Sequence, residues 1–410
     1  MTQTKKAYKM KKLALSVVFI MSVFLVSAQN SKVQKAITLS KPQYNELDKA
    51  KEAIDMAIEH EKTKDNPKTW KVRGQVYQAI AKSEDEKFKS LAENPLKIAI
   101  ESFQKAQSLD TKGKYKGEIA LSYLTISDMQ INRGVDFFNA GVESQNTEDF
   151  VKAFQAFKSA LDVKTMVDET AIDTIVIFNA GIAADRGKLY DEAIKFYSRV
   201  AELKYEGSKI YGFMANIKKE QGDTAAYVQY LKDGIEAYPD DNTVLMVELI
   251  NYYLNADLSD LALEYLSLAI EKDPTNQTFY FAQGALYDKL KDFENAKASY
   301  EKAVELKNDY FDAYYNLGAL FFNKGADMLK LANEIPPNQQ KKYDEAVKTS
   351  FKELEKALPY LEKAHEIQPT EETTILTLKE IYFKLRNDKE EYMNKFKEMD
   401  EKIKALPAKE

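Results

Sequence analysis

The sequence predicts an all-α solenoid built from antiparallel helix pairs, and three observations support this fold class. The chain of 410 residues has only 14 Gly and 10 Pro, and its composition is dominated by Ala, Leu, Lys and Glu, as in helices. Its small and aromatic residues recur with a period of roughly 34 residues. Each period contains two amphipathic stretches joined by a short connector.

The stretch 280–308 shows the recurring pattern most fully. Tyr280 is followed by Gly284 on the first amphipathic stretch, and Ala296 and Tyr300 follow on the second. Equivalent anchor positions, about 34 residues apart, are Ile177, Tyr211, Met246, Tyr280 and Tyr314. A constant period of this length indicates stacked repeats, because each unit buries its apolar face against the next.

The glycines of the first stretches need a structural reason, since glycine inside a helix costs ~1 kcal/mol relative to alanine. We expect the small residue to lie where the axes of the two helices approach each other, and the aromatic residues to fill the wider gaps beside it. Pro239, Pro274 and Pro369 each follow a second stretch and end its helix, because proline cannot continue the backbone hydrogen-bond ladder.

This order of aromatic, Gly and Tyr on the first helix and Ala, aromatic and Ala on the second resembles the tetratricopeptide repeat. The resemblance covers residues 66–386, with about seven or eight repeats and with insertions near 81–94 and 325–351. It implies a right-handed superhelix whose concave face binds partners. Residues 29–65 are expected to form an N-terminal capping helix region, and residues 387–410 a C-terminal capping helix and tail.

Both insertions are expected to lengthen helix pairs rather than to form separate domains. Residues 326–334 and 343–358 keep helical apolar spacing on either side of Pro336 and Pro337, which mark the tip of the longer insertion. A further long helix is expected over residues 114–145.

The repeat at 137–160 belongs to that long helix and its partner. The spacing assigns Gly141 as the small residue of its first helix and Phe157 as the aromatic residue of its second helix.

Residues 1–28 are typical of a secretory signal peptide. Lysines precede an apolar run from Leu13 to Val26, and small residues around Ala28 suit signal peptidase. We expect cleavage after Ala28; the alternative is a retained N-terminal anchor, although a membrane span needs about 20 apolar residues. The mature chain is then expected in the periplasm or cell envelope, without a membrane span of its own.

Charge and residue inventory exclude several classes of function. Removal of residues 1–28 takes away five lysines and no acid, which moves the net charge from −6 to −11 and disfavours nucleic acid as a partner. The chain has no Cys, and its two histidines, His60 and His365, lack metal-ligand spacing. We therefore expect no catalytic, cofactor or metal site, and no enzymatic activity.

The family resemblance implies that first-helix residues three before, one after and four after the small position face the groove. The residues expected to contact a partner are Phe178, Asn216, Asn251, Phe281 and Tyr315. An asparagine donates and accepts hydrogen bonds, so it can hold a peptide backbone while aromatic residues bury side chains. Packing against the next repeat is the alternative role for Phe178 and Phe281.

The sequence thus predicts an exported, non-catalytic scaffold that binds other proteins or peptides on its concave face. One alternative is a structural subunit of a bacterial envelope or secretion assembly, which would use its convex face and the 325–351 hairpin. Another is a glycan-handling accessory protein, since aromatic groove positions suit a sugar as well as a peptide.

Overall fold

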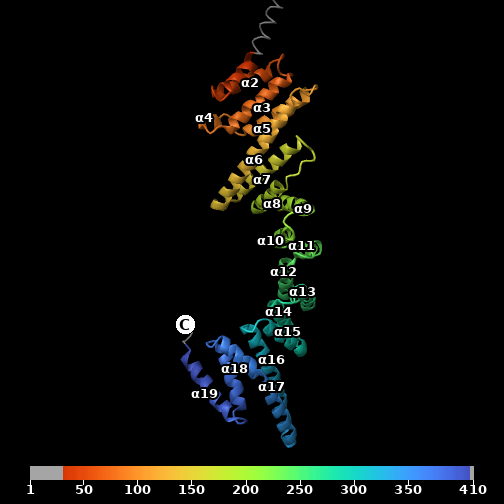
Figure 1. Ribbon diagram of the computed structural model, residues 1–410, viewed down its shortest axis with the longest axis vertical. Helices are drawn as coiled ribbons and strands as arrows, with labels where there is room; N and C mark the ends of the chain where they lie inside the picture. The colour runs from red at the N-terminus through yellow and green to blue at the C-terminus, as the bar shows by residue number, and fades with distance from the viewer. Residues whose placement is uncertain (1–30, 407–410) are drawn as a thin grey trace, which may run out of the picture. The chain divides into compact units, whose positions relative to one another are not determined.

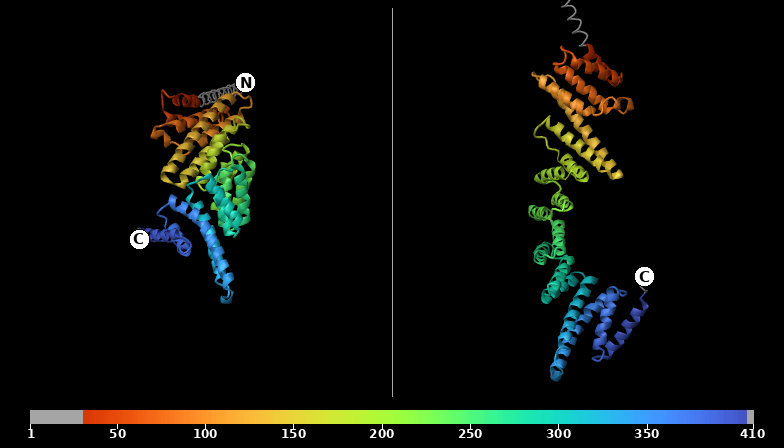
Figure 2. Two further views of the ribbon diagram at one scale, coloured as in Figure 1. Left: turned by 60° about the horizontal axis from the view of Figure 1, so that its bottom comes forward. Right: turned by 180° about the vertical axis from the view of Figure 1, so that it is seen from behind.

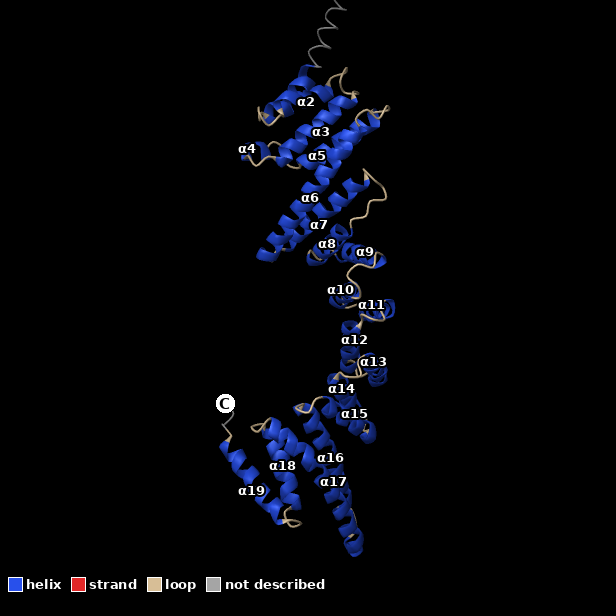
Figure 3. Cartoon of the chain, viewed as in Figure 1, coloured by secondary structure: helices blue, strands red, loops and turns tan. Residues whose placement is uncertain are grey.

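The computed structural model describes residues 31–406, which form helices and contain no strand (Figure 3). The predicted signal peptide lies outside these residues. The predicted fold class, an all-α array of antiparallel helix pairs, is confirmed. No helix within 31–406 combines the length and the apolar character needed to cross a bilayer.

The first compact unit extends to Tyr230 (Figure 1). Its helices are α2 (Leu47–Glu59), α3 (Pro67–Lys82), α4 (Glu86–Lys89), α5 (Pro95–Leu109), α6 (Lys116–Ser144), α7 (Thr147–Thr165), α8 (Thr174–Arg186), α9 (Tyr190–Glu202) and α10 (Lys209–Glu220). Helix α11 (Thr224–Ala237) contains the division between the units. The long helices α6 and α7 run side by side in opposite directions (Figure 2).

The second compact unit begins at Leu231. Its helices are α12 (Thr243–Asn255), α13 (Ser259–Lys272), α14 (Gln277–Lys289), α15 (Phe293–Leu306), α16 (Phe311–Ala332), α17 (Gln340–Ile367), α18 (Glu372–Leu385) and α19 (Glu390–Ala405), with a 3-10 turn at Pro337–Gln339. Pro239, Pro274 and Pro369 lie just beyond α11, α13 and α17, as the sequence predicts.

The N-terminal part differs from the sequence-based expectation in two places. Residues 31–39 are helical, so α2 is preceded by a helix where a single capping helix was expected. The first insertion does not lengthen its helix pair: α3 ends at Lys82, and α4 is a single turn in the connection. The reason lies at the start of α5, where the Asn94 side chain accepts a hydrogen bond from the Lys97 backbone and Pro95 occupies the first helical position.

The second insertion lengthens its helix pair, in line with the expectation. Helix α16 continues to Ala332, and α17 starts after the 3-10 turn at Pro337–Gln339. The two extensions contact each other directly, since Ser350 Oγ donates a buried hydrogen bond of 2.8 Å to the Gly325 carbonyl. The hairpin is thus a packed continuation of the repeat.

Helix α19 covers the end of the second unit with an apolar face. Tyr392 and Met399 are buried, and the Tyr392 ring lies 5.9 Å from the ring of Tyr382 on α18. Phe396 makes a similar contact with Phe383, with ring centroids 5.4 Å apart. These contacts are those of a terminal cap, which shields the last repeat from water.

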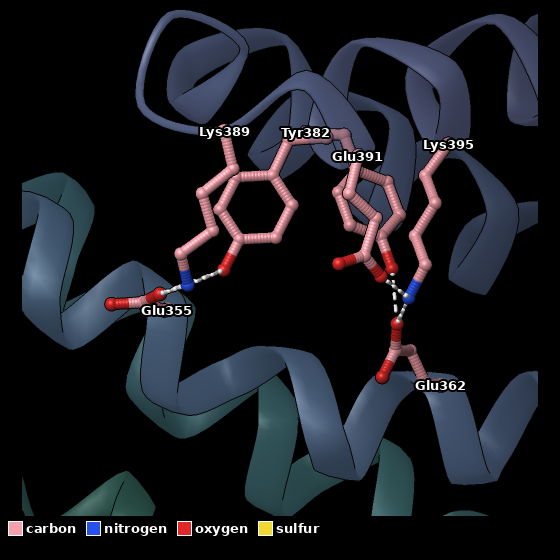
Figure 4. A network of polar contacts seen from close by, with 7 residues as sticks. Glu355, Glu362, Tyr382, Lys389, Glu391 and Lys395 are labelled. Atoms are coloured by element: carbon pink, nitrogen blue, oxygen red, sulfur yellow. Dashed lines mark hydrogen bonds and ion pairs between the residues drawn. The ribbon is translucent and has the colours of Figure 1, made fainter.

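A polar network joins this cap to α17 (Figure 4). The Glu355 carboxylate accepts hydrogen bonds from Lys389 Nζ at 2.6 Å and from the Tyr392 hydroxyl at 2.7 Å. The Glu362 carboxylate accepts one from the Tyr382 hydroxyl at 2.5 Å and also pairs with Lys395. The hydrogen bond from Lys389 holds the pKa of Glu355 below its usual value, which favours the ionised acceptor.

Candidate functional site

Contacts between small and aromatic residues fix which face each first helix presents. A Cβ atom on Gly284 would lie 2.7 Å from the ring of Tyr300, and one on Gly181 would lie 2.9 Å from the ring of Tyr197. These distances are too short for a side chain, so glycine is required for the close approach of the two helices. The predicted packing role of the small position is confirmed in these two repeats.

The long pair α6–α7 has a different register from the one predicted. Gly134, and not Gly141, faces Phe157: a Cβ on Gly134 would lie 2.6 Å from its ring. Gly141 instead faces Phe150 at 3.0 Å, nearer the turn between the helices. The register therefore shifts by two helical turns. Counted from Gly134, the groove-facing positions of α6 become Ile131, Val135 and Phe138.

Two of the predicted contact residues, Phe178 and Asn216, lie in the first unit. The half-buried ring of Phe178 packs edge-on against Tyr205 at 5.6 Å and lies 6.3 Å from Phe213. Phe178 thus contacts the following repeat, which was its alternative role. Asn216 on α10 is exposed.

The other three predicted residues lie in the second unit. Asn251 on α12 is exposed. The half-buried ring of Phe281 lies 5.9 Å from Tyr300 and 5.2 Å from Tyr310, so it also packs within the repeats. Tyr315 stacks on Phe311 with ring centroids 6.1 Å apart. The role of these residues in binding stays a prediction.

The structure brings together a site that the sequence reasoning missed. Between the first helices α6 and α8 lies a pocket of about 140 Å³, lined by Val135 and Phe138 from α6 and by Asn179 and Ile182 from α8, with Phe157 beneath. Asn179 offers an amide among apolar groups. The signal was present in the sequence, because Val135 and Phe138 are groove positions once Gly134 is taken as the small residue.

A half-buried acid lies one turn further along α8. Asp185 accepts a hydrogen bond of 3.2 Å from the Tyr197 hydroxyl. Burial raises the pKa of Asp185 above its usual value. Tyr197 therefore makes two contacts with α8: its ring packs against Gly181, and its hydroxyl bonds to the carboxylate of Asp185.

A second and larger cavity lies on the side of the second helices. It measures about 700 Å³ and is lined by α5, α6 and α7. Gln130, only 7% exposed, donates a hydrogen bond of 3.1 Å to Ser159 Oγ in its wall. The guanidinium of Arg133 lies 5.2 Å from the centre of the Phe137 ring. The cavity therefore combines amides, a hydroxyl, three cationic side chains and the carboxylate of Glu101.

Neither histidine belongs to a metal-binding cluster within the described part of the chain. His365 Nε2 lies 2.8 Å from Lys402 Nζ at the junction of α17 and α19. Burial lowers the pKa of His365, and the nearby lysine adds to this effect. His60 accepts a local hydrogen bond from the backbone of Lys62.

A family model described as the TPR repeat, the tetratricopeptide repeat, matches residues 284–325. This segment runs from Gly284 through the second helix α15 into α16, and so spans one full interval between small positions. The chain thus contains a tetratricopeptide repeat. Its TPR fold is consistent with a scaffold for protein–protein interaction.

Curated relatives match parts of the chain. A TPR repeat-containing protein of Methanocaldococcus jannaschii is 23% identical over 235 residues, which are 57% of this chain and 33% of that protein. Anaphase-promoting complex subunit 3 of Schizosaccharomyces pombe is 33% identical over 82 residues, or 19% of this chain and 12% of the yeast protein. The chain thus spans a third or less of the length of these relatives.

Solved structures resemble the chain as well. The C-terminal part of a TPR repeat-containing protein from Cytophaga hutchinsonii is 16% identical, covers 66% of this chain and 95% of its own length, and superposes with a TM-score of 0.43. The MamA protein is 21% identical, covers 50% of this chain and 97% of its own, and has a TM-score of 0.36.

Proposed function

We propose that the protein is an exported, non-catalytic scaffold that binds other proteins or peptides on the face formed by its first helices. The observation that carries the proposal is the set of exposed groups on that face. Asn216 in the first unit and Asn251 in the second unit are each exposed at the same groove position of their own repeat. The apolar pocket between α6 and α8 is also lined by first helices. Recognition of a peptide requires side chains that hydrogen-bond its backbone and apolar pockets that bury its side chains.

Substitution of both asparagines is expected to weaken binding without altering the fold. The captured partner is obtained by affinity capture with the mature chain from envelope extract, and its affinity is then measured. Each lost hydrogen bond is worth about 0.5–1.5 kcal/mol, so Asn216→Ala with Asn251→Ala is expected to weaken the partner by roughly 1–3 kcal/mol. Circular dichroism is expected to be unchanged, because both side chains are exposed.

Matched controls come from exposed residues on second helices. Lys195→Ala on α9 with Glu271→Ala on α13 is expected to leave the affinity unchanged. If this control pair weakens the partner and the asparagine pair does not, the partner binds the second-helix side, as a subunit of an envelope assembly would. Phe281→Ala is a less direct test, because Phe281 also packs against Tyr300 and Tyr310.

Export rests on the charged, apolar and small-residue segments in residues 1–28. N-terminal sequencing of protein recovered from the envelope is expected to begin at Gln29. Protein that still contains the run from Leu13 to Val26 would instead indicate a membrane anchor, and protein found only in the cytoplasm would refute export.

A further inference from the structure

Helix α6 carries a regular stripe that its own unit covers only at Ile131 and Phe138, which are half-buried. Residues spaced alternately three and four apart are Leu121, Leu124, Asp128, Ile131, Val135, Phe138 and Val142. Four of the apolar members are exposed, and Leu121 reaches 67% and Val142 58%. Residues with this spacing lie on one face of a helix and form the contact line of a coiled coil.

The face of α6 next to the stripe is already occupied. Gly134 and Gly141 face α7 there, and the Phe138 ring at the edge of the stripe packs on Phe150 of α7 at 5.3 Å. The exposed members of the stripe therefore lie beside the face that holds the helix pair together. From Leu121 to Val142 the stripe extends over about 32 Å at 1.5 Å per residue. Exposure of apolar side chains over this length is unfavourable in a free protein and marks a surface of contact.

The pocket beside the stripe has the geometry of a socket for one side chain. Val135 and Phe138 form its α6 wall, and Asn179 and Ile182 form its α8 wall. In coiled-coil packing, a side chain of one helix inserts into such a hole between residues of its neighbour. A volume of about 140 Å³ suits a single large aliphatic side chain.

Asp128 determines the kind of helix that fits. It is exposed at the third of the seven positions of the stripe, and no ion pair with it occurs among residues 31–406. A helix docked over Asp128 would bury this charge, which is costly unless the helix brings a cation. A second copy of α6 cannot supply it, because the stripe contains no Lys or Arg.

We propose that α6 docks one amphipathic helix of a partner protein, with apolar residues at three-four spacing and a Lys or Arg opposite Asp128. The proposal rests on the proposed function and specifies the class of partner bound by the first unit. The partner helix lies along the stripe and inserts one aliphatic side chain into the pocket between α6 and α8.

The test uses two fluorescent peptides and the full chain. Each peptide is a 21-residue amphipathic helix with leucines at three-four spacing, and the central position of the apolar line is Lys in one and Glu in the other. Fluorescence anisotropy is expected to show at least ten-fold tighter binding of the Lys peptide. Asp128→Lys is expected to reverse this preference, with unchanged circular dichroism because Asp128 is exposed.

Variants along the stripe complete the test. Val135→Ser with Val142→Ser is expected to reduce binding of the Lys peptide at least ten-fold, whereas Ala140→Ser, on α6 outside the stripe, is expected to leave it unchanged. Equal binding of the two peptides, or full binding by the double serine variant, would overturn the proposal.

The peptide result is independent of the captured-partner experiment. If the asparagine pair weakens the captured partner while the stripe variants bind the peptides like the parent, the helix-docking proposal fails and the proposed function stands. If the peptides bind as expected and the asparagine pair has no effect, the stripe is supported and the role of Asn216 and Asn251 is refuted.

Discussion

Gly134→Leu is expected to destabilise the first unit, whereas Gly117→Leu on the same helix is expected to leave it as stable as the parent. A side chain at 134 would collide with the ring of Phe157, which is 2% exposed and held in the core between α6 and α7. Overpacking of this kind costs about 1–3 kcal/mol. A Cβ at 117 would meet no heavy atom within 4 Å, and leucine is a better helix former than glycine.

Urea unfolding and hydrogen exchange of α6 and α7 measure the two variants. The Gly134 variant is expected to lose protection in both helices, and the Gly117 variant in neither. Equal stability of the two variants would mean that Gly134 is not the contact point, and the groove positions derived from it would be wrong.

Tyr392→Ala is expected to detach the C-terminal cap. The substitution removes a buried ring that lies against Tyr382, and it removes a hydroxyl that donates to Glu355. Truncation of a buried aromatic side chain costs about 3–5 kcal/mol, although the loss is smaller where the site can relax, as at the end of a chain. Asn394→Ala, two residues further along α19 and exposed, is the matched control.

Hydrogen exchange in α18 and α19 is the appropriate measurement, because a repeat array can open locally. We expect faster exchange in both helices for Tyr392→Ala, unchanged exchange in α12 and α13, and parent-like exchange everywhere for Asn394→Ala. Parent-like protection of α18 in Tyr392→Ala would show that α19 does not stabilise the last repeat.

The repeats with ordinary spacing could be predicted closely from the sequence. Gly284 and Tyr300, like Gly181 and Tyr197, are the small and aromatic residues of the recurring pattern, and each pair is in contact. This works because the helical period and the short connector together leave one register in which the small residue meets the ring.

The register of α6 and α7 could not be predicted, and the reason is physical. Gly134 and Gly141 are seven residues apart, which is close to two full turns, so both lie on nearly the same face of α6. The choice between the two glycines depends on the turn that joins the helices. Gln145 adopts a left-handed conformation with φ of 55°, and the side chain of the next residue, Asn146, accepts a hydrogen bond from the Glu148 backbone. Helix α7 therefore begins directly after the turn. That brings Phe150 to Gly141 and Phe157 to Gly134.

The contacts of the predicted site residues could not be fully predicted from the sequence either. A one-helix pattern identifies groove positions, but it does not show whether a ring at such a position turns to the next repeat, as Phe178 does toward Tyr205 and Phe213. The orientation of exposed asparagines is easier to predict, because no apolar contact competes for their side chains. On α6, Gly141 as the small residue places Phe138 and Val142 in the groove, and Gly134 adds Ile131 and Val135.

The glycine spacing in the two long helix pairs determines which insertions and deletions such pairs can accommodate. Gly318 and Gly325 on α16 face Leu361 and Leu354 on α17, just as Gly134 and Gly141 face Phe157 and Phe150. Both pairs therefore repeat their contact after seven residues, where the helical face returns with a rotation of only about 20°. The helices of such a pair can be lengthened or shortened in steps of two turns while every remaining contact is kept. Insertions of other sizes would rotate the new segment away from its partner, so heptad steps are the increments that both natural variation and engineering of this scaffold can use.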